Sequence, residues 1–336
     1  MFDEETIVLP FFGGYMTVEN QDELKKRAAV MYYRDDMTQA EIARALYLSR
    51  TKISRLLKAA KEENIVDIRI NGGFRRNDYL EHIFEERYGL KEAVILADIP
   101  GGEDEALRTV ARAAAEYIDS ILTKDSIIGI GRGRTLQTVV ECMEPQRFLP
   151  IQVVQLIGLL NNPSQNEEEM ELVRQFAKVY GASCHNLFAP FILDDKQARQ
   201  VLNRVAAVGK TIELAKQANV ILSSVGNFDL KDKRILWNSY LGKEEKLRLI
   251  QQGAVGLFFG RYYDREGRIL DTELHNKIFG LEVEEIINKE QVITVAQGQK
   301  KALPFLGALH GGLMKTLITD ENTALNVLIQ EGKMIE

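Results

Sequence analysis

The sequence predicts an α/β fold in which a small all-α domain precedes a larger, mainly parallel α/β domain. The chain has 336 residues, of which 45% are apolar and 27% are charged. This length and composition are typical of about two globular domains. Apolar residues recur at helical spacing over residues 21–63. From about residue 91 onward, short β-rich runs alternate with helical stretches, as they do in proteins built from βαβ units.

The composition argues against several classes of protein. No apolar run approaches the roughly 18 residues that span a bilayer, so no membrane contact is expected. The acidic start, residues 1–5, lacks the basic segment of a secretory signal. Cys142 and Cys184 form neither a disulfide framework nor a metal-ligand spacing, and the histidines lie far apart in sequence. We therefore expect a cytoplasmic protein that holds no metal ion and no cofactor.

The all-α domain is expected over residues 21–70, after an N-terminal extension, residues 1–20, that gives no clear pattern. The whole chain carries a net charge of −6, yet residues 21–70 have eleven basic and eight acidic side chains. Every ionised residue from 44 to 61 is positive. A short basic stretch in an acidic protein indicates contact with a polyanion, although a solvated helix face gives the same pattern.

The basic stretch has the form of a helix-turn-helix. Thr38 and Glu41 make a capping box that opens one helix, and Ser49 is a good N-cap for the next. Apolar residues fall on one face of the second helix and basic residues on the other, which fits the major groove of DNA. An ordinary αα-hairpin is the alternative. Tyr47 occupies a turn position where glycine is common, which allows a strained turn or a slightly different inter-helix angle. The predicted DNA-binding residues are Thr38, Gln39, Ser49, Arg50, Thr51, Lys52, Ser54, Arg55 and Lys58.

A polar, glycine-containing linker is expected over residues 71–77, and the α/β domain over residues 78–336. Helical spacing of apolar residues predicts a helix at 105–122. Strands that alternate with such helices give a Rossmann-like, mainly parallel sheet. The strands are expected at 93–96, 126–130, 152–157, 183–188, 220–225, 292–296 and 316–319.

One loop of the larger domain is suited to binding an anion. The sequence Gly131-Arg132-Gly133-Arg134-Thr135, here the GRGRT loop, follows a predicted strand and precedes a predicted helix at 136–143. This order places backbone N–H groups and the positive end of the helix dipole around an anion, and Arg134 adds a bidentate donor for phosphate. The loop is no dinucleotide fingerprint, because Leu136 replaces the third glycine, and no P-loop. A tight βα turn is the alternative.

Several short segments run through nearly the whole chain in a specific order. They are MTQAEIA at 37–43, LSR at 48–50, ISRLL at 53–57, GRGRTL at 131–136, VVQLIG at 153–158, AP at 189–190, GAVG at 253–256, FGRYYD at 259–264, GGL at 311–313 and LITDE at 317–321. In order and spacing they resemble the SorC family of bacterial sugar-responsive transcription regulators. The resemblance implies an N-terminal DNA-binding domain and a C-terminal effector domain similar to ribose-5-phosphate isomerase and glucosamine-6-phosphate deaminase folds. It also implies a phosphorylated sugar or related metabolite as effector, and a dimer-to-tetramer assembly.

Carried over residue by residue, the GRGRT loop is similar to the effector-phosphate site of that family, and Lys301 matches a lysine that reaches the ligand. The effector-binding residues implied are Gly131, Arg132, Gly133, Arg134, Thr135 and Lys301. Leu257 stands where many relatives have an acidic residue suited to sugar hydroxyls, and Arg132 stands where an aromatic residue is frequent. These departures leave open a less hydroxylated ligand or a degenerate effector site.

The sequence thus predicts a DNA-binding transcriptional regulator of a carbohydrate catabolism operon, controlled by a phosphorylated sugar or related metabolite. Operator DNA, this metabolite and further copies of the chain are the expected partners. The alternative is a sugar-phosphate isomerase- or deaminase-like enzyme with an accessory DNA-binding segment. Such chemistry needs a positioned carboxylate base. Because Leu257 removes one obvious carboxylate, no catalytic residue is predicted.

Overall fold

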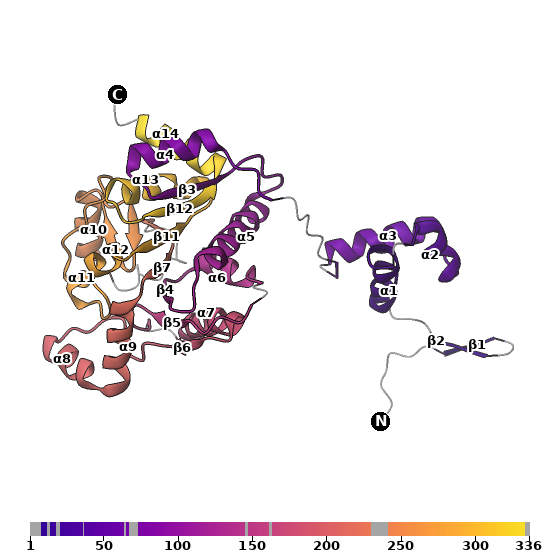
Figure 1. Ribbon diagram of the computed structural model, residues 1–336, viewed down its shortest axis with the longest axis horizontal. Coiled ribbons are helices and arrows are strands. Elements are labelled where there is room, and N and C mark those ends of the chain that lie inside the picture. The colour runs from indigo at the N-terminus through magenta and orange to yellow at the C-terminus, as the bar shows by residue number, and fades with distance from the viewer. Residues whose placement is uncertain are drawn as a thin grey trace. The chain divides into compact units, whose positions relative to one another are not determined.

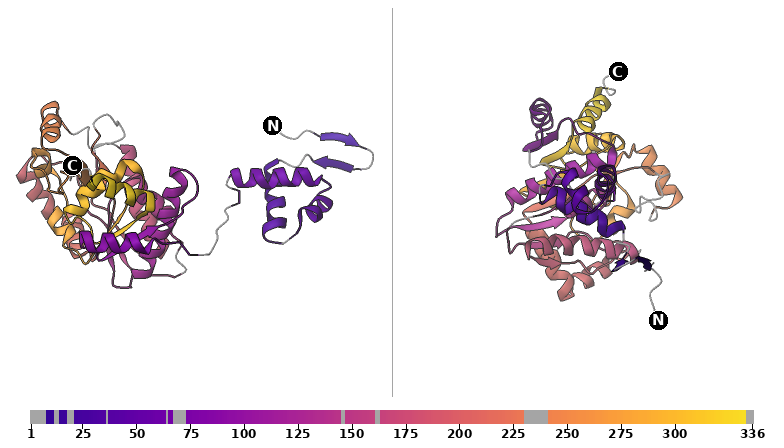
Figure 2. Two further views of the ribbon diagram at one scale, coloured as in Figure 1. Left: turned by 90° about the horizontal axis from the view of Figure 1, so that it is seen from above. Right: turned by 90° about the vertical axis from the view of Figure 1, so that its right-hand side faces the viewer.

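The structure is a computed structural model that describes residues 8–11, 14–17, 21–35, 37–63, 65–66, 73–144, 147–160, 163–229 and 241–332. The chain divides into two compact units, Met1–Gly73 and Phe74–Glu336, here the N-terminal unit and the C-terminal unit. Figure 1 labels their helices and strands, and Figure 2 gives two further views.

The N-terminal unit contains a short hairpin and a group of helices around a small apolar core. Strands β1 (Val8–Phe11) and β2 (Gly14–Thr17) pair antiparallel within residues 1–20, for which no secondary structure was predicted. The helices are α1 (Gln21–Tyr33), α2 (Gln39–Ala45) and α3 (Arg50–Glu62). Their buried side chains form one cluster, which comprises Ala28, Ala29, Ile42, Ile53, Leu56, Leu57 and Ala60. The apolar face predicted for the second helix of the motif is therefore the face that packs into the core.

In the C-terminal unit, seven strands among the described residues form one parallel sheet in the order β3-β12-β11-β7-β4-β5-β6. They are β3 (Glu92–Leu96), β4 (Ile127–Ile130), β5 (Gln152–Gln155), β6 (Ser183–His185), β7 (Val220–Ser223), β11 (Gln291–Val295) and β12 (Thr316–Asp320). Each lies at a predicted strand, so the predicted mainly parallel α/β class is confirmed. After β5 the Gln155 side chain replaces the backbone hydrogen bonds between the two strands. Its NH₂ group donates to the Ile157 carbonyl at 2.9 Å, and its carbonyl oxygen accepts from the Leu187 N–H at 3.2 Å. Strands β5 and β6 therefore end before the predicted positions.

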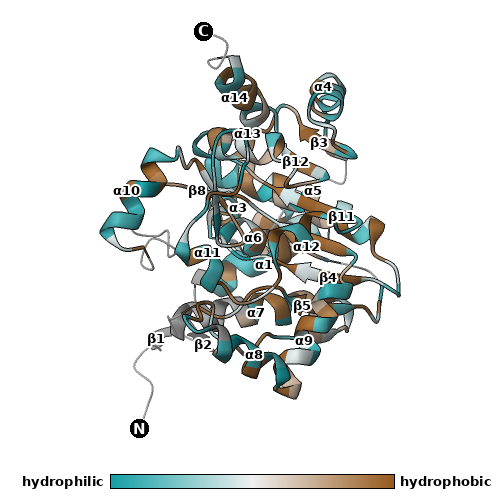
Figure 3. Cartoon of the chain, turned by 90° about the vertical axis from the view of Figure 1, so that its left-hand side faces the viewer, coloured by the Kyte–Doolittle hydropathy of each residue, from teal (hydrophilic) through white to brown (hydrophobic). Residues whose placement is uncertain are grey.

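Helices cover both faces of this sheet (Figures 1 and 2). One face packs against α4 (Asp78–Tyr88), α9 (Ala206–Gln217), α13 (Ala302–His310) and α14 (Glu321–Gly332). The other packs against α5 (Glu103–Ile121), α6 (Arg134–Glu141) and α7 (Pro163–Tyr180). Successive residues of β3 alternate between the two cores, because side chains of a strand point to opposite faces. In Figure 3 the strands carry brown, hydrophobic segments.

A second, smaller sheet was not predicted. Strands β8 (Gly226–Asn227), β9 (Gly256–Phe258) and β10 (Arg261–Tyr263) pair antiparallel. They are too short to give a clear alternation in sequence. The remaining described elements are α8 (Lys196–Arg204), α10 (Lys243–Gln251), α11 (Glu273–Lys277), α12 (Val283–Ile287) and the 3₁₀ turn η2 (Gln299–Lys301).

The strand order reverses between β4 and β7, which are neighbours in the sheet. From β4 the chain moves outward through β5 and β6. It then returns to β7 and proceeds through β11 to β12, which lies beside the edge strand β3. In open parallel sheets, ligands bind outside the carboxyl ends of the strands at such a reversal. The GRGRT loop follows β4, so the topology places it at this position.

The chain that enters the C-terminal unit is fixed to the sheet before α4 begins. Arg76 pairs with the Glu81 carboxylate through two bonds of 2.7 and 3.0 Å and donates to the Ala93 carbonyl at 3.0 Å. The Asn77 N–H donates to the Ile95 carbonyl at 2.8 Å. Residues 74–77, expected to be linker, therefore belong to the C-terminal unit, because their backbone and side-chain groups bond to β3 and α4. Residues 71–72 of that expected linker lie outside the described residues.

Candidate functional site

The helix-turn-helix has the end groups that its sequence predicts. The Glu41 N–H donates to the Thr38 hydroxyl at 3.3 Å, and the Glu41 carboxylate accepts from the Thr38 N–H at 2.8 Å. These bonds complete a capping box at the start of α2. Ser49 caps α3, since its hydroxyl accepts from the Lys52 N–H at 3.2 Å. Local sequence alone thus fixes where both helices begin.

The turn between α2 and α3 is a Schellman motif with a tyrosine in the left-handed position. Tyr47 has φ +55°, and its side chain is 95% exposed. The Leu48 N–H donates to the Ala43 carbonyl at 2.9 Å and the Tyr47 N–H to the Arg44 carbonyl at 3.3 Å, which is the bond pattern of that motif. Of the two outcomes left open by the sequence, the structure therefore has the strained turn, since a residue with a Cβ is disfavoured in this conformation.

The side chains opposite the apolar face of α3 lie in solvent. Arg50, Thr51, Lys52, Ser54, Arg55 and Lys58 are all exposed on α3, as are Ser49 and Thr38 at the two caps, while Gln39 is partly buried. Lys25 of α1 links α1 to the end of α3: this buried lysine donates to the Asp22 carboxylate at 2.9 Å and to the Glu63 carboxylate at 2.5 Å. Helix α3 thus has a cationic outer face and a packed inner face.

The GRGRT loop is a tight connection between β4 and α6. The Gly131 N–H donates to the Leu222 carbonyl of β7 at 2.8 Å, so this amide continues the sheet rather than facing a ligand. A Cβ at Gly131 would stand 3.3 Å from that carbonyl and from the Phe259 ring, which explains the glycine. Gly133 has φ +114°, which favours glycine, and α6 begins after it without a side-chain cap. The first amides of α6 therefore have no side-chain acceptor from the N-cap, as in helix ends that bind anions.

Lys301 reaches the same edge of the sheet from the other side of β7. Its ammonium donates to the Val225 carbonyl at 2.5 Å and lies 3.5 Å from the Ser224 hydroxyl, just beyond the end of β7. Burial, together with the positive charge of Arg134, lowers the pKa of Lys301 to about 8. The two residues are 167 positions apart in sequence, yet the charge of Arg134 acts on the Lys301 ammonium. Such an arrangement favours an anion between them.

The remaining predicted effector residues occupy different environments. Thr135 is buried in the first turn of α6, Arg132 is partly buried, and the Arg134 side chain is 74% exposed. The Arg134 guanidinium lies 4.0 Å from the Asp104 carboxylate on α5, which is the limit of an ion pair. The loop is thus cationic on balance. Ser224 and Val225 join this site in the structure although the sequence did not single them out. The adjacency of β4 and β7, which brings them there, has no local signal in the sequence.

Leu257 packs into an apolar cluster. It is 4% exposed and groups with Leu241, Leu249, Tyr262, Leu270 and Leu274. The neighbouring Phe259 is the residue whose ring approaches Gly131, and it has φ +44°. The ring of Phe259 therefore packs beside Gly131 of the GRGRT loop, whereas Leu257 belongs to a separate apolar cluster.

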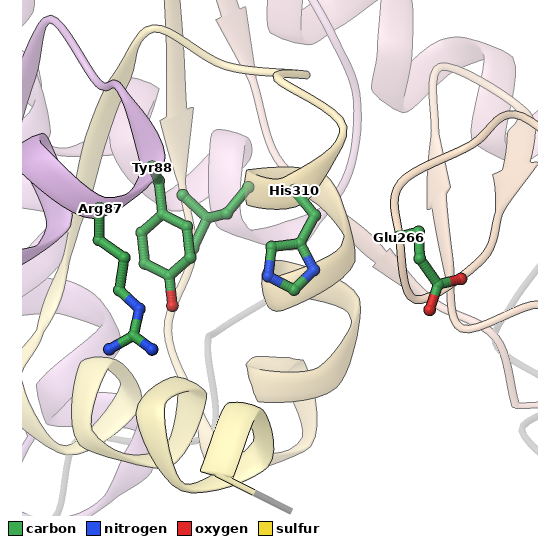
Figure 4. Close-up of a pocket in the computed structure, with 5 residues that line it drawn as sticks. Arg87, Tyr88, Glu266 and His310 are labelled. Atoms are coloured by element: carbon green, nitrogen blue, oxygen red, sulfur yellow. The ribbon is translucent and has the colours of Figure 1, made fainter. Parts of the chain in front are cut away.

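The part of the chain that the structure describes has few other features of a functional site. No group of three or more His, Cys, Asp or Glu side chains there is arranged to hold a metal ion. None of the described helices has the length and apolarity needed to cross a bilayer. A depression of about 440 Å³ is lined by Arg87, Tyr88, Glu266, Leu309 and His310 (Figure 4). It contains none of the residues predicted to bind an effector.

Comparison with known proteins assigns the chain to a family. The sugar-binding domain family "Sugar-bind" matches residues 74–329. The sorbitol operon regulator of Klebsiella pneumoniae is 32% identical over 91% of this chain and 98% of its own length. The chain belongs to the SorC family of sugar-binding transcription regulators. The deoxyribonucleoside regulator of Bacillus subtilis is 31% identical over 90% of this chain and 96% of its own length.

A solved structure supports the SorC assignment at the level of the fold. The crystal structure of the full-length sorbitol operon regulator SorC from Klebsiella pneumoniae matches with a TM-score of 0.67 at 30% identity. The match covers 92% of this chain and 100% of that one, so both units have counterparts there. The family expected from the sequence segments is confirmed, and its curated relatives are named as transcription regulators.

Proposed function

We propose that this SorC-family protein binds operator DNA through α3 and that a phosphorylated sugar or related metabolite, bound between the GRGRT loop and Lys301, controls that binding. The operon under control would be one of carbohydrate catabolism. The residues proposed to bind the effector and those proposed to contact DNA thus lie in separate units of the chain. Two relatives are named a sorbitol operon regulator and a deoxyribonucleoside regulator, which supports a sugar-derived effector.

The convergence of Arg134 and Lys301 carries this proposal. Both side chains lie at the carboxyl edge of the sheet where the strand order reverses, beside a helix start that lacks a side-chain cap. A phosphate placed there would accept from Arg134, from Lys301 and from the first amides of α6. It would also offset the repulsion between the two cations. The N–H groups and cations supply recognition of the phosphate, and the sugar would extend toward Phe259 and Ser224.

At the other site, the exposed basic face of α3 supports binding to a duplex. We assign Arg55 and Thr51 to the base edges, with Lys52 at the flank, and Arg50 and Lys58 mainly to phosphates. Thr38, Gln39, Ser49 and Ser54 lie at the helix starts or beside these residues and complete the proposed contact surface. The Schellman turn and the Lys25–Glu63 pair would keep α3 in a fixed orientation as it enters the groove.

A thermal-shift screen of sugar phosphates tests the effector site. A ligand at a hundred times its dissociation constant should stabilise the protein by about 2.7 kcal/mol. Arg134→Ala should remove most of that shift, because a hydrogen bond to a charged group contributes about 1.5–3 kcal/mol. Arg204→Ala, at an exposed position of α8, removes the same charge away from the site and should leave the shift unchanged. A full shift in Arg134→Ala would remove this loop from the effector site.

The screen also separates the regulator from the enzyme. Incubation of the stabilising compound with the protein should return it unchanged; conversion to an isomer or a deaminated product would favour the enzymatic alternative.

We further propose a cytoplasmic homo-oligomer, because a single helix-turn-helix offers less contact area than the roughly 1,000–2,500 Å² that specific DNA binding usually buries. Sedimentation at micromolar concentration should give a dimer or tetramer, and a monomer with and without operator DNA would contradict this.

A further inference from the structure

Helices α4 and α14 are joined at their N-terminal ends by a side-chain pair that spans 244 residues of sequence. The Asn77 side chain accepts from the Leu80 N–H at 3.0 Å and so caps α4. Its amide group donates to the Glu321 carboxylate at 2.7 Å. One asparagine therefore serves both helices, since Glu321 is the first residue of α14. Figure 1 shows α4 and α14 at the same end of the C-terminal unit.

The C-terminal ends of the two helices are also joined. The Glu331 carboxylate of α14 accepts from Arg87 at 3.1 Å and from the Tyr88 hydroxyl at 2.9 Å. The side chain of Glu331 is only 13% exposed, and the bond to it contributes to a raised pKa of Tyr88, after burial of the ring. Figure 4 shows Arg87 and Tyr88 on α4 beside His310 of α13. With a link at each end, α4 is constrained to follow a displacement of α14.

Helix α14 is bonded in turn to the segment that carries Lys301. The Gly298 N–H, directly before η2, donates to the Thr323 hydroxyl at 2.9 Å. Thr323 is buried, and its hydroxyl donates to the Asp320 carboxylate at 2.7 Å. Thr323 lies in the first turn of α14, two residues after Glu321. The segment around Lys301 and the Asn77–Glu321 pair thus contact the same helical turn.

Asn77 lies close to the junction of the two units. It follows Gly73, the last residue of the N-terminal unit, by four positions. Its backbone N–H is bonded to β3, and Arg76 is bonded to Glu81 and to Ala93. The residues through which the C-terminal unit continues into the DNA-binding unit are therefore held by α4 and by the edge strand of the sheet.

We propose that the first turn of α14 relays the state of the effector site to the residues that lead to the DNA-binding unit, through the bond between Glu321 and Asn77. This inference rests on the proposed function, because the signal starts when an anion engages Lys301. The relay runs from Lys301 through Gly298 and Thr323 to Glu321, and from there to Asn77. Asn77 acts here as a positioning residue and contacts neither ligand.

Two substitutions break and restore the relay without removing the cap of α4. Asn77→Asp keeps an oxygen for the Leu80 N–H, because aspartate is as good an N-cap as asparagine. It removes the donor to Glu321 and places two carboxylates against each other. Adding Glu321→Gln supplies an amide that can donate to Asp at position 77, so the double variant restores the bond with its direction reversed. Asn322→Asp is the matched control, since it introduces the same charge at an exposed neighbour of Glu321.

Amide hydrogen exchange of the full-length protein, with and without saturating inorganic phosphate, is the measurement. In the wild type, phosphate should slow exchange both in residues 132–138 and in residues 75–81, the latter by about fivefold, a value at the low end of site-to-site coupling. Asn77→Asp should keep the protection at 132–138 and lose that at 75–81. The double variant and Asn322→Asp should show both. Thermal melts of all variants without phosphate check that the fold is intact.

The outcomes separate the relay from the site on which it depends. Protection at 132–138 together with an unaltered response at 75–81 in Asn77→Asp contradicts the relay and leaves the effector site standing. The same holds if the double variant fails to recover the response while its loop is protected. Absence of protection at 132–138 in the wild type contradicts the phosphate site itself, and the relay then falls with it.

Discussion

The outer face of α3 and the GRGRT loop are both cationic, yet they differ in how the charges are held. On α3 the basic side chains are exposed and follow one another within a single helix. At the loop, Arg134 and Lys301 come from distant segments, and the pKa of Lys301 is lowered to about 8 by burial and by the charge of Arg134.

This difference separates a surface that attracts an anion from a site that selects one. Exposed charges are solvated and screened within about 10 Å at 0.1 M salt, so they steer a long polyanion and bind it through many weak contacts. Partly desolvated charges interact more strongly with a single small anion, because little water competes with it. We therefore propose that the same residue types bind DNA in one unit and a metabolite in the other.

The largest expected effect comes from placing a charge in the apolar cluster beside the effector site. Leu257→Asp introduces an acidic residue at a position where Leu257 is 4% exposed among leucines and Tyr262. The lost packing and the buried carboxylate should lower the free energy of unfolding by at least about 3 kcal/mol. Chemical denaturation measures this. Leu247→Asp, at a leucine 60% exposed on α10, is the control and should change it by less than about 0.5 kcal/mol. A stable Leu257→Asp protein with altered sugar preference would mean that residue 257 faces the ligand.

The next largest expected effect distinguishes base contacts from phosphate contacts on the outer face of α3. Arg55→Ala should cost about 1–3 kcal/mol of specific DNA affinity and relax sequence preference, because arginine discriminates base edges. Lys58→Ala should weaken binding to all sequences alike and reduce the salt slope by about one unit. Binding to a duplex selected from a random pool, compared with a scrambled duplex over a range of salt, gives both quantities. Equal losses on both duplexes in Arg55→Ala would move Arg55 to the phosphate contacts.

The pH dependence of effector binding sharpens the contrast between the exposed cations of α3 and the partly buried Lys301. A bound phosphate favours the protonated form of Lys301, so affinity should be full below about pH 8 and fall as the pH rises through that value. The decrease should approach tenfold per pH unit, which is about 1.4 kcal/mol. Calorimetric titration with a sugar phosphate between pH 7 and 9.5 measures it. Lys301→Arg remains charged throughout and should flatten the profile; an unchanged profile in this variant would assign the titration to another group.

The smallest effect concerns the turn that orients α3. Tyr47→Gly should stabilise the N-terminal unit by about 0.5–1 kcal/mol, because glycine adopts φ +55° without a Cβ clash. Few contacts are lost, since the tyrosine side chain is 95% exposed. Hydrogen exchange of the α3 amides in the full-length protein reports the gain. Tyr47→Ala removes the same ring but keeps the Cβ, so it should give no gain. A gain of equal size in both variants would show that the ring, and not the backbone conformation, causes the strain.

Much of this protein is determined by local sequence. The capping box of Thr38 and Glu41, the Ser49 cap and the apolar face of α3 define the helix-turn-helix, because each depends on residues within three or four positions of one another. The seven strands of the large sheet follow from short β-rich runs that alternate with helical spacing. Gly131 and Gly133 likewise identify the GRGRT loop from local sequence, because a strand, a tight turn and a helix start follow one another along the chain.

The tertiary structure alone decided which distant segments meet. The β8–β10 sheet was missed because its strands are very short. The place of Leu257 in an apolar cluster, the entry of Ser224 and Val225 into the site and the bond between Asn77 and Glu321 depend on the strand order, which brings β4 beside β7 and β12 beside β3. Local propensity acts over a few residues, whereas strand order is set by how complete elements bury their apolar faces against one another. The sequence therefore determined the elements and the loop, and the fold determined which charges and hydrogen bonds converge on them.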